Sequence, residues 1–286
     1  MQQNNRKKQF IPFIMAGDPS EELTIDLALS LQKYGATAIE LGVPYSDPLA
    51  DGPVIQRASI RARKNGMNIE KAIYLGKKLK ENGVEIPIIL FTYFNPVLQL
   101  GENRFFALMQ QNNIDGLLIP DLPFEESSLI KEKCGKYQID FISMVAPTSN
   151  QRIEMIAKNA EGFLYCVSSL GVTGERRDFD ERIEAFIQHV KAYSSVPVVV
   201  GFGISKREHV EKFYQIADGV VIGSAIIRKI ESLLPLFTNS TLKREGLQRF
   251  EQFLQDLVSL GNERGAEDES QRTIENVKAL STGQTD

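Results

Sequence analysis

Glu40 is a carboxylate residue within an otherwise apolar run, residues 37–43, whose composition is typical of a buried strand. Successive side chains of a strand point to opposite faces, so Glu40 lies opposite the bulky residues Ile39 and Leu41. Because the bulky face must cover the helices, we expect Glu40 to point into the interior of the fold. Desolvation there raises the pKa of a carboxyl group towards the range useful for proton transfer. The alternative is a structural glutamate that a neighbouring donor satisfies, although none of the strands expected below contains Lys or Arg.

Asp51 follows in the loop 44–53, whose three prolines restrict the backbone and so partly preorganise its side chains. Together with Glu40 it forms a pair of carboxylates suited to acid–base chemistry. A structural alternative stays open, because Pro53 begins a helical pattern and Asp51 is well placed to be its N-cap. Asp47, which precedes Pro48 in the same loop, has the composition of a turn residue.

Three glycine-containing turns form a second group of candidate residues, at 171–174, 201–205 and 223–224. Gly203 and Gly223 follow the last two expected strands, and Ser224 begins an apolar helical pattern. In a barrel, such turns bind phosphate through backbone N–H groups and a helix dipole, without needing Lys or Arg. The alternatives are tight turns and helix caps. The charged loop 171–179 after the sixth strand has the composition of a hinged lid or of an ordinary solvated connection.

The elements that must position these residues alternate along the chain. Short apolar runs, at 10–16, 38–43, 86–91, 116–119, 140–145, 162–167, 196–200 and 219–222, are separated by segments with helical spacing. Strands alternating with helices indicate an α/β fold with a parallel sheet, and eight units favour a single (β/α)8 TIM barrel. An open doubly wound sheet is the main rival, but the first turn, 16–19, lacks the GxGxxG pattern.

The C-terminal part of the chain predicts one extra helix followed by a tail. Apolar residues of the segment 247–258 share one helical face, and Gly261 suits the helix stop. Residues 262–286 are polar and weakly patterned. We therefore expect a barrel domain over residues 1–261 and a polar C-terminal tail over residues 262–286.

Composition excludes several classes of function. The 286 residues contain 33 basic and 37 acidic side chains, so the net charge of −4 offers no basic footprint for nucleic acid. Neither an apolar leader nor a run long enough to span a membrane is present. Cys134 and Cys166 lack metal-site spacing, and both histidines, His189 and His209, fall on expected outer helices. We expect a cytoplasmic protein without a metal site.

The segment 40–53, ELGVPYSDPLADGP, closely resembles the signature of the tryptophan synthase alpha chain family. Shorter segments at 10–13, 17–19, 120–123, 171–174, 201–204 and 223–226 also resemble motifs of that family, in the same order. The resemblance covers residues 10–260. The long motif is highly specific, whereas the glycine turns are shared with other phosphate-binding barrels.

The resemblance implies a lyase of tryptophan biosynthesis that cleaves indole-3-glycerol phosphate to indole and D-glyceraldehyde 3-phosphate. It also implies an α2β2 heterotetramer, in which a partner beta chain uses the indole to make tryptophan. Pyridoxal phosphate is expected only in that beta chain, so no cofactor is expected here. The loops that contain Asp47 and residues 93–96 are expected to face the beta chain.

Roles for individual residues follow from their positions in the family's motifs. Glu40 resembles the catalytic acid and base, Asp51 resembles the carboxylate that binds the indole N–H, and Tyr165 is a further catalytic candidate. Thr173 resembles the lid threonine that contacts Asp51 on closure. The residues that resemble the phosphate site are Gly174, Gly203, Gly223 and Ser224, and those expected to line the indole pocket are Phe13, Phe91 and Tyr93.

Other interpretations keep the barrel and change the function. A phosphopentose epimerase would need metal-binding histidines and an indole-glycerol-phosphate synthase would need strand lysines, and neither set is present. A non-catalytic barrel that binds a phosphometabolite and regulates a partner chain is the alternative of a different class. Turnover by the isolated chain discriminates between it and the enzyme.

Overall fold

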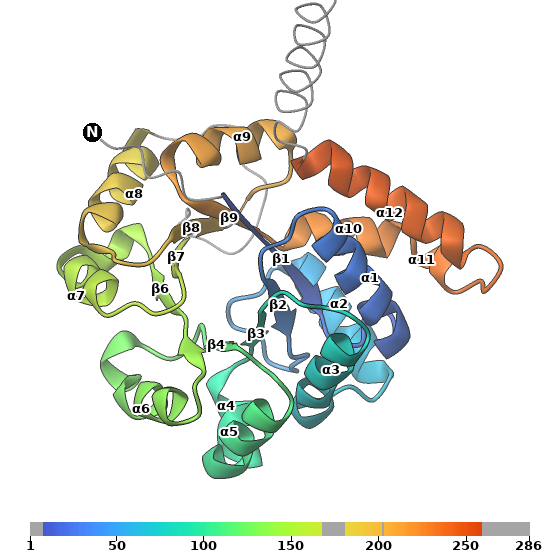
Figure 1. Cartoon of the computed structure of the whole chain (residues 1–286), viewed down its shortest axis with the longest axis horizontal. Coiled ribbons are helices and arrows are strands. Elements are labelled where there is room, and N and C mark those ends of the chain that lie inside the picture. The colour runs from blue at the N-terminus through green and yellow to red at the C-terminus, as the bar shows by residue number, and fades with distance from the viewer. Residues whose placement is uncertain (1–7, 168–180, 202, 259–286) are drawn as a thin grey trace, which may run out of the picture.

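The computed structural model describes residues 8–167, 181–201 and 203–258, and these form a barrel of parallel strands surrounded by helices (Figure 1). The strands are β1 (Gln9–Met15), β2 (Ile39–Gly42), β3 (Ile88–Phe91), β4 (Gly116–Leu118), β5 (Asp140–Phe141), β6 (Ser143–Val145), β7 (Leu164–Val167), β8 (Val198–Gly201) and β9 (Gly219–Ile222). They pair in the order β5-β4-β3-β2-β1-β9-β8-β7-β6, and each pairing that the structure records is parallel.

The helices lie outside this sheet, as expected for an α/β barrel (Figure 1). They are α1 (Glu21–Lys33), α2 (Pro53–Lys64), α3 (Ile69–Glu81), α4 (Phe94–Leu100), α5 (Glu102–Gln111), α6 (Ser128–Lys136), α7 (Ile153–Lys158), α8 (Glu181–Tyr193), α9 (Arg207–Ile216), α10 (Ser224–Ser232), α11 (Leu234–Phe237) and α12 (Lys243–Val258), with short 3-10 turns at Phe124–Glu126 and Pro147–Arg152. No helix in these described ranges is long and apolar enough to cross a membrane.

The fifth expected strand, 140–145, is divided into β5 and β6 at Ile142. Asp140 and Phe141 pair with β4, whereas the residues after Ile142 pair with β7. The Ile142 N–H still donates to the Leu117 carbonyl oxygen at 2.9 Å, on the β4 side. A single stretch of chain therefore changes partner, and this change joins the two ends of the sheet. The other seven expected strands occur with ends shifted by no more than about two residues.

Side-chain alternation divides the apolar residues between two faces of the strands. The residues that fill the barrel interior form one cluster, Ile11, Ala38, Ile89, Leu118, Ile142, Phe163, Tyr165, Val199 and Val221. Ile39 and Leu41 belong instead to the larger cluster between strands and helices and are completely buried. Glu40, two residues after Ala38, therefore shares the interior face, as the period of the strand requires.

The extra C-terminal helix is α12, which lies against α1 outside the barrel (Figure 1). Phe250, Leu254 and Leu257 are its buried residues on the apolar face. Glu251 joins the helix to the C-terminal part of α1, where it accepts from the Lys33 ammonium group at 2.8 Å and from the Ser30 hydroxyl at 3.2 Å. The expected tail, residues 262–286, lies outside the described residues.

Candidate active site

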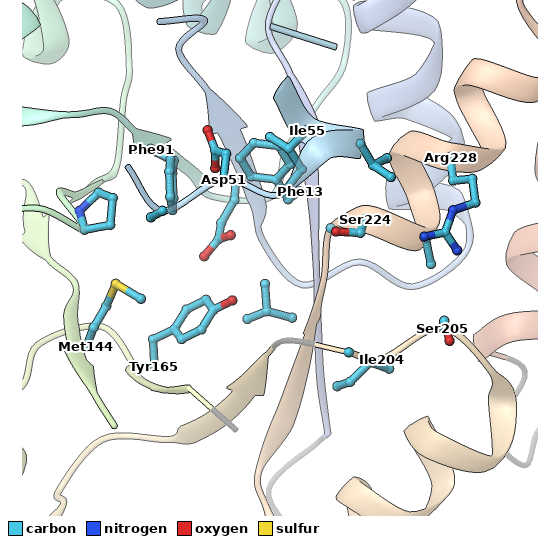
Figure 2. Close-up of a pocket in the computed structure, with 18 residues that line it drawn as sticks. Phe13, Asp51, Ile55, Phe91, Met144, Tyr165, Ile204, Ser205, Ser224 and Arg228 are labelled. Atoms are coloured by element: carbon cyan, nitrogen blue, oxygen red, sulfur yellow. The ribbon is translucent and has the colours of Figure 1, made fainter. Parts of the chain in front are cut away.

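A cavity of about 870 Å³, its open mouth included, lies at the carboxyl ends of the strands. Its wall combines aromatic and apolar side chains with two carboxyl groups, Glu40 and Asp51, and with the turns after β8 and β9 (Figure 2). In a parallel barrel the loops that follow the strands gather at one end, which explains why residues distant in sequence meet here. The cavity brings together the two candidate carboxylates and the described part of the candidate phosphate site.

Glu40 lies on β2 between Phe13 of β1 and Ile89 of β3, its neighbours in the sheet register. The residue is only 2% exposed, and its Oε1 atom has no hydrogen-bond partner among the described residues. Burial without a compensating cation raises the pKa of the Glu40 carboxyl to about 8. A carboxyl group with such a pKa is mostly protonated at neutral pH and can both donate and recover a proton.

Asp51 stands at the cavity edge just before α2. The N-cap of α2 is Gly52, with no side-chain capping bond, so Asp51 does not serve as the helix cap. Burial raises the pKa of Asp51 to about 6, and a hydrogen bond from the Tyr93 hydroxyl opposes that rise. Asp51 is therefore the more acidic of the two carboxyl groups. Between about pH 6 and pH 8, Asp51 is mostly ionised while Glu40 keeps its proton.

Tyr93 departs from the expected placement in the indole pocket. It is not among the residues that line the cavity but lies behind Asp51, with 1% of its surface exposed. Its hydroxyl donates to the Asp51 carboxylate and accepts from the Ala50 N–H at 3.1 Å. Tyr93 thus orients Asp51. Its place in the sequence, two residues after the end of β3, is compatible with either role.

Phe13 and Phe91, two residues that the resemblance assigns to the indole pocket, line the cavity with their aromatic rings (Figure 2). Their ring centroids are 5.5 Å apart at an interplanar angle of 85°, an edge-to-face arrangement. Gly42 makes room for it, because a Cβ atom at that position would overlap the Phe13 ring. The apolar wall suits a flat aromatic ligand near the carboxyl groups.

Tyr165 of β7 lines the cavity from the opposite side. Burial raises its phenol pKa well above the usual value, and the nearby negative charge of Glu40 raises it further. The hydroxyl occupies the space that a side chain on Gly201 of β8 would fill. Tyr165 is therefore a neutral phenol beside Glu40.

The candidate phosphate site is described in part. Gly203 has φ of +77°, a conformation that favours glycine, and Gly223 is the N-cap of α10, with Ser224 as its first residue. The first N–H groups of a helix have no partner within the helix and can bind an anion. Gly203, Gly223 and Ser224 all line the cavity. Thr173 and Gly174 lie outside the described residues.

Arg228 also lines the cavity, although it belongs to none of the sequence motifs described above. It lies on α10, four residues after Ser224, and therefore on the same side of the helix. That spacing could have identified it.

A cluster of ion pairs holds α2 and α10 together behind the site. Arg61 of α2 binds Asp18 in a bidentate pair at 2.7 and 2.8 Å and Glu231 of α10 at 2.7 Å. Arg57 also binds Glu231, at 2.8 and 2.7 Å. Arg57 and then Arg61 lower the pKa of Glu231 to about 2, which keeps it charged. Because α2 follows Asp51 and α10 follows Gly223, the cluster positions these two parts of the site relative to each other.

The sequence model of the tryptophan synthase alpha chain family matches residues 1–260 of the chain. The chain is 62% identical over 247 residues to the tryptophan synthase alpha chain of Bacillus pumilus, covering 86% of this chain and 92% of the relative. The identity to the corresponding chain of Bacillus subtilis strain 168 is 60% over the same shares.

Solved structures show the same similarity. A structure from the tryptophan synthase α2β2 complex of Pyrococcus furiosus superposes with a TM-score of 0.79 at 33% identity, covering 89% of this chain and 99% of that one. The tryptophan synthase subunit alpha of Legionella pneumophila gives a TM-score of 0.75 at 34% identity, covering 88% and 94%. Relatives at this identity, matched over nearly their whole length, share a family and not only a fold.

Proposed function

The chain belongs to the tryptophan synthase alpha chain family, and from that premise we propose that Glu40 and Asp51 carry out the family's cleavage of indole-3-glycerol phosphate. The products are indole and D-glyceraldehyde 3-phosphate. The observation that carries this assignment is the Glu40 carboxyl group, which is buried, has an Oε1 atom without a hydrogen-bond partner among the described residues, and lines the cavity. Burying a carboxyl group without a hydrogen-bond partner costs free energy, and a role in proton transfer accounts for its place in the cavity.

The retro-aldol cleavage requires a proton at C3 of the indole ring and the loss of the proton of the side-chain hydroxyl. The protonated Glu40 carboxyl donates to C3, and the ring becomes an iminium with positive charge at nitrogen. The resulting Glu40 carboxylate then takes the hydroxyl proton while the bond between C3 and the side chain breaks and its electron pair returns to the ring. Glu40 ends protonated, so one residue serves in both steps.

Asp51 stabilises the positive charge at the ring nitrogen by accepting a hydrogen bond from the indole N–H. Its pKa of about 6 keeps the carboxylate ionised while Glu40 remains protonated. Phe13 and Phe91 hold the indole ring, and the neutral Tyr165 borders the space beside Glu40. The phosphate binds the N–H groups around Gly203, Gly223 and Ser224.

Our proposal also assigns Gly174 to the phosphate site and Thr173 to the lid, on their positions in the family's motifs alone, because both lie outside the described residues. No cofactor takes part, since two carboxyl groups of different pKa are enough to move the proton. Pyridoxal phosphate belongs to the partner beta chain, with which this chain forms an α2β2 tetramer. We place the reaction in the barrel domain, residues 1–261, and the protein in the cytoplasm, where the free thiols Cys134 and Cys166 stay reduced.

The face that we propose for the beta chain is the rim around the loop 44–53. Asp47 is exposed there, and Leu49 is 77% exposed although it is a large apolar residue. Burial of Leu49 in an interface removes its apolar surface from water, which favours association.

The experiment is to incubate the purified chain with indole-3-glycerol phosphate, with and without a beta chain, and to measure indole. We expect indole from the wild type, and indole formation slower by about 100-fold or more from the Glu40→Gln variant that still binds substrate. The matched control is Glu81→Gln, which removes an exposed carboxylate on α3. Binding without turnover by the wild type would instead support a non-catalytic, regulatory barrel.

A further inference from the structure

We propose that Arg228 binds the phosphate of the substrate and so determines which way round the substrate enters the cavity. This inference rests on the proposed function and extends its phosphate site beyond backbone N–H groups. Arg228 lines the same cavity as Gly203, Gly223 and Ser224. In Figure 2, Arg228, Ser205 and Ser224 lie together at one end of the cavity, away from Met144 and Phe91.

The geometry of α10 directs the Arg228 side chain towards the candidate phosphate site. Side chains of a helix lean towards its N-terminus and cover the turn before their own Cα atoms. Arg228 is one turn after Ser224, so its guanidinium is directed back over the turn that begins at Gly223. An arginine can bind phosphate oxygens in a bidentate manner that no backbone N–H can reproduce.

The charges of α10 favour an external anion at this end of the cavity. The first turns of α1, α3, α5 and α9 contain acidic residues, which offset the positive end of the helix dipole, whereas those of α2, α4 and α6 contain none. The first turn of α10 contains none, and Arg228 adds a positive charge one turn later. A phosphate dianion supplies the negative charge that this helix end lacks.

The acidic and basic side chains of the cavity lie in different parts of its wall. The charged side chains among its described lining residues are Glu40 and Asp51 at one part and Arg228 at the other. An ionised Asp51 repels a phosphate group and attracts the indole N–H, whereas Arg228 attracts the phosphate. The two charges therefore favour the same orientation of the substrate, with the ring at the carboxylates and the phosphate at α10.

The test compares Arg228→Gln with Lys229→Gln in the full-length chain. Lys229 is the adjacent residue of α10, does not line the cavity, and has its ammonium group 5.7 Å from the centroid of the Phe253 ring. Both variants remove one positive charge from one helix. For indole-3-glycerol phosphate we expect Arg228→Gln to raise KM about threefold to fivefold, the upper part of the range for one charged contact at an exposed position, with kcat within about twofold.

Two inhibitors separate phosphate binding from a general change of shape. The inhibition constant of inorganic phosphate should rise in Arg228→Gln by about the same factor as KM, while that of the product indole stays unchanged. Arg228→Lys should give an intermediate value, because the charge remains but the bidentate geometry is lost. Lys229→Gln should match the wild type in all three measurements.

The outcomes distinguish this inference from the proposed function. Absence of indole formation by the wild type would overturn the proposed function itself. A wild type that turns over, with KM and phosphate inhibition equal in Arg228→Gln and Lys229→Gln, would overturn the role of Arg228 alone. An equal rise in the inhibition constants of phosphate and of indole would also overturn it. If Arg228→Gln does not fold, the inhibition constants of phosphate and indole measured in Arg228→Lys decide.

Discussion

Replacing Glu40 by Gln should make the protein more stable at alkaline pH while it strongly lowers kcat. The Glu40 carboxyl has an ordinary pKa of 4.5 when unfolded and a pKa of about 8 in the folded protein. Between these values the folded state holds a proton that the unfolded state has lost, so the free energy of unfolding falls as pH rises. The contribution is fully present below pH 4.5 and is lost by the time pH passes about 8.

The magnitude follows from the separation of the two pKa values. Each pH unit corresponds to about 1.4 kcal/mol, so ionising Glu40 in the folded protein costs on the order of 5 kcal/mol. Glutamine carries no charge at any pH and avoids this cost. A buried amide with an unsatisfied group costs about 1–3 kcal/mol of its own, which lowers the gain at pH 9 to roughly 2–4 kcal/mol.

The assay is urea unfolding of wild type, Glu40→Gln and Glu81→Gln at intervals from pH 5 to pH 9. The difference between Glu40→Gln and wild type should grow by about 1.4 kcal/mol per pH unit and level off above pH 8. Glu81 is exposed, with 61% of its side chain accessible, so its variant should track the wild type. A difference that does not change with pH would refute the desolvated environment that we assign to Glu40.

The same samples test catalysis, because stability and activity should move in opposite directions. Loss of a general acid and base lowers kcat by about 10²- to 10⁴-fold. If Glu40→Gln retained most of its indole release with substrate bound, Glu40 would not be the proton carrier, whatever its effect on stability.

Three further predictions concern the other parts of the site. The pH dependence of kcat/KM should be bell-shaped, rising near pH 6 as Asp51 ionises and falling near pH 8 as Glu40 loses its proton. Asp51→Asn should remove the rise near pH 6 and lower kcat/KM by an amount that corresponds to a loss of ~3 kcal/mol of transition-state stabilisation. Equal activity of the variant and the wild type would exclude the role of Asp51. Tyr93→Phe should move this rise in kcat/KM to higher pH, because the hydrogen bond from Tyr93 lowers the pKa of Asp51. The Ala50 N–H loses its acceptor in this variant, which should lower the free energy of unfolding in urea by about 1–3 kcal/mol. A pH profile that does not move would show that Tyr93 does not control the ionisation of Asp51. Gly223→Ala should change the free energy of unfolding by no more than about 1 kcal/mol, since the nearest atom to the new methyl group is the Phe13 Cβ at 3.4 Å. The variant should nevertheless raise KM and weaken inhibition by inorganic phosphate. Unchanged phosphate inhibition would rule out phosphate binding at this turn.

The order of elements could be predicted from the sequence because its signals are local. Alternation of apolar runs with helical spacing depends only on neighbouring residues, and it located every strand to within about two residues. The exception is the segment 140–145, which is divided at Ile142. Nothing within that segment encodes the change, because it arises from pairing first with β4 and then with β7.

In the candidate site, too, local features could be predicted from the sequence and long-range contacts could not. Glu40 could be placed on the interior face from the period of its own strand, and the glycine turns from their positions after strands. The N-cap alternative for Asp51 could not be excluded from spacing alone, because the choice between Asp51 and Gly52 depends on how the loop enters α2. The contact of Tyr93 with Asp51 and the place of Arg228 in the cavity join residues from different loops and helices, whose separation is set by packing.

By itself, the sequence determined which chemical groups the protein possesses, the alternation that makes a barrel of them, and the strand face that bears Glu40. Those properties are local, since they follow from side-chain type and from the two-residue and 3.6-residue periods of the backbone. Only the tertiary structure decided the protonation behaviour of the two carboxyl groups and the identity of their neighbours. A pKa depends on the water removed and the charges brought near by every surrounding element, and those are known only once the strands have closed around the cavity.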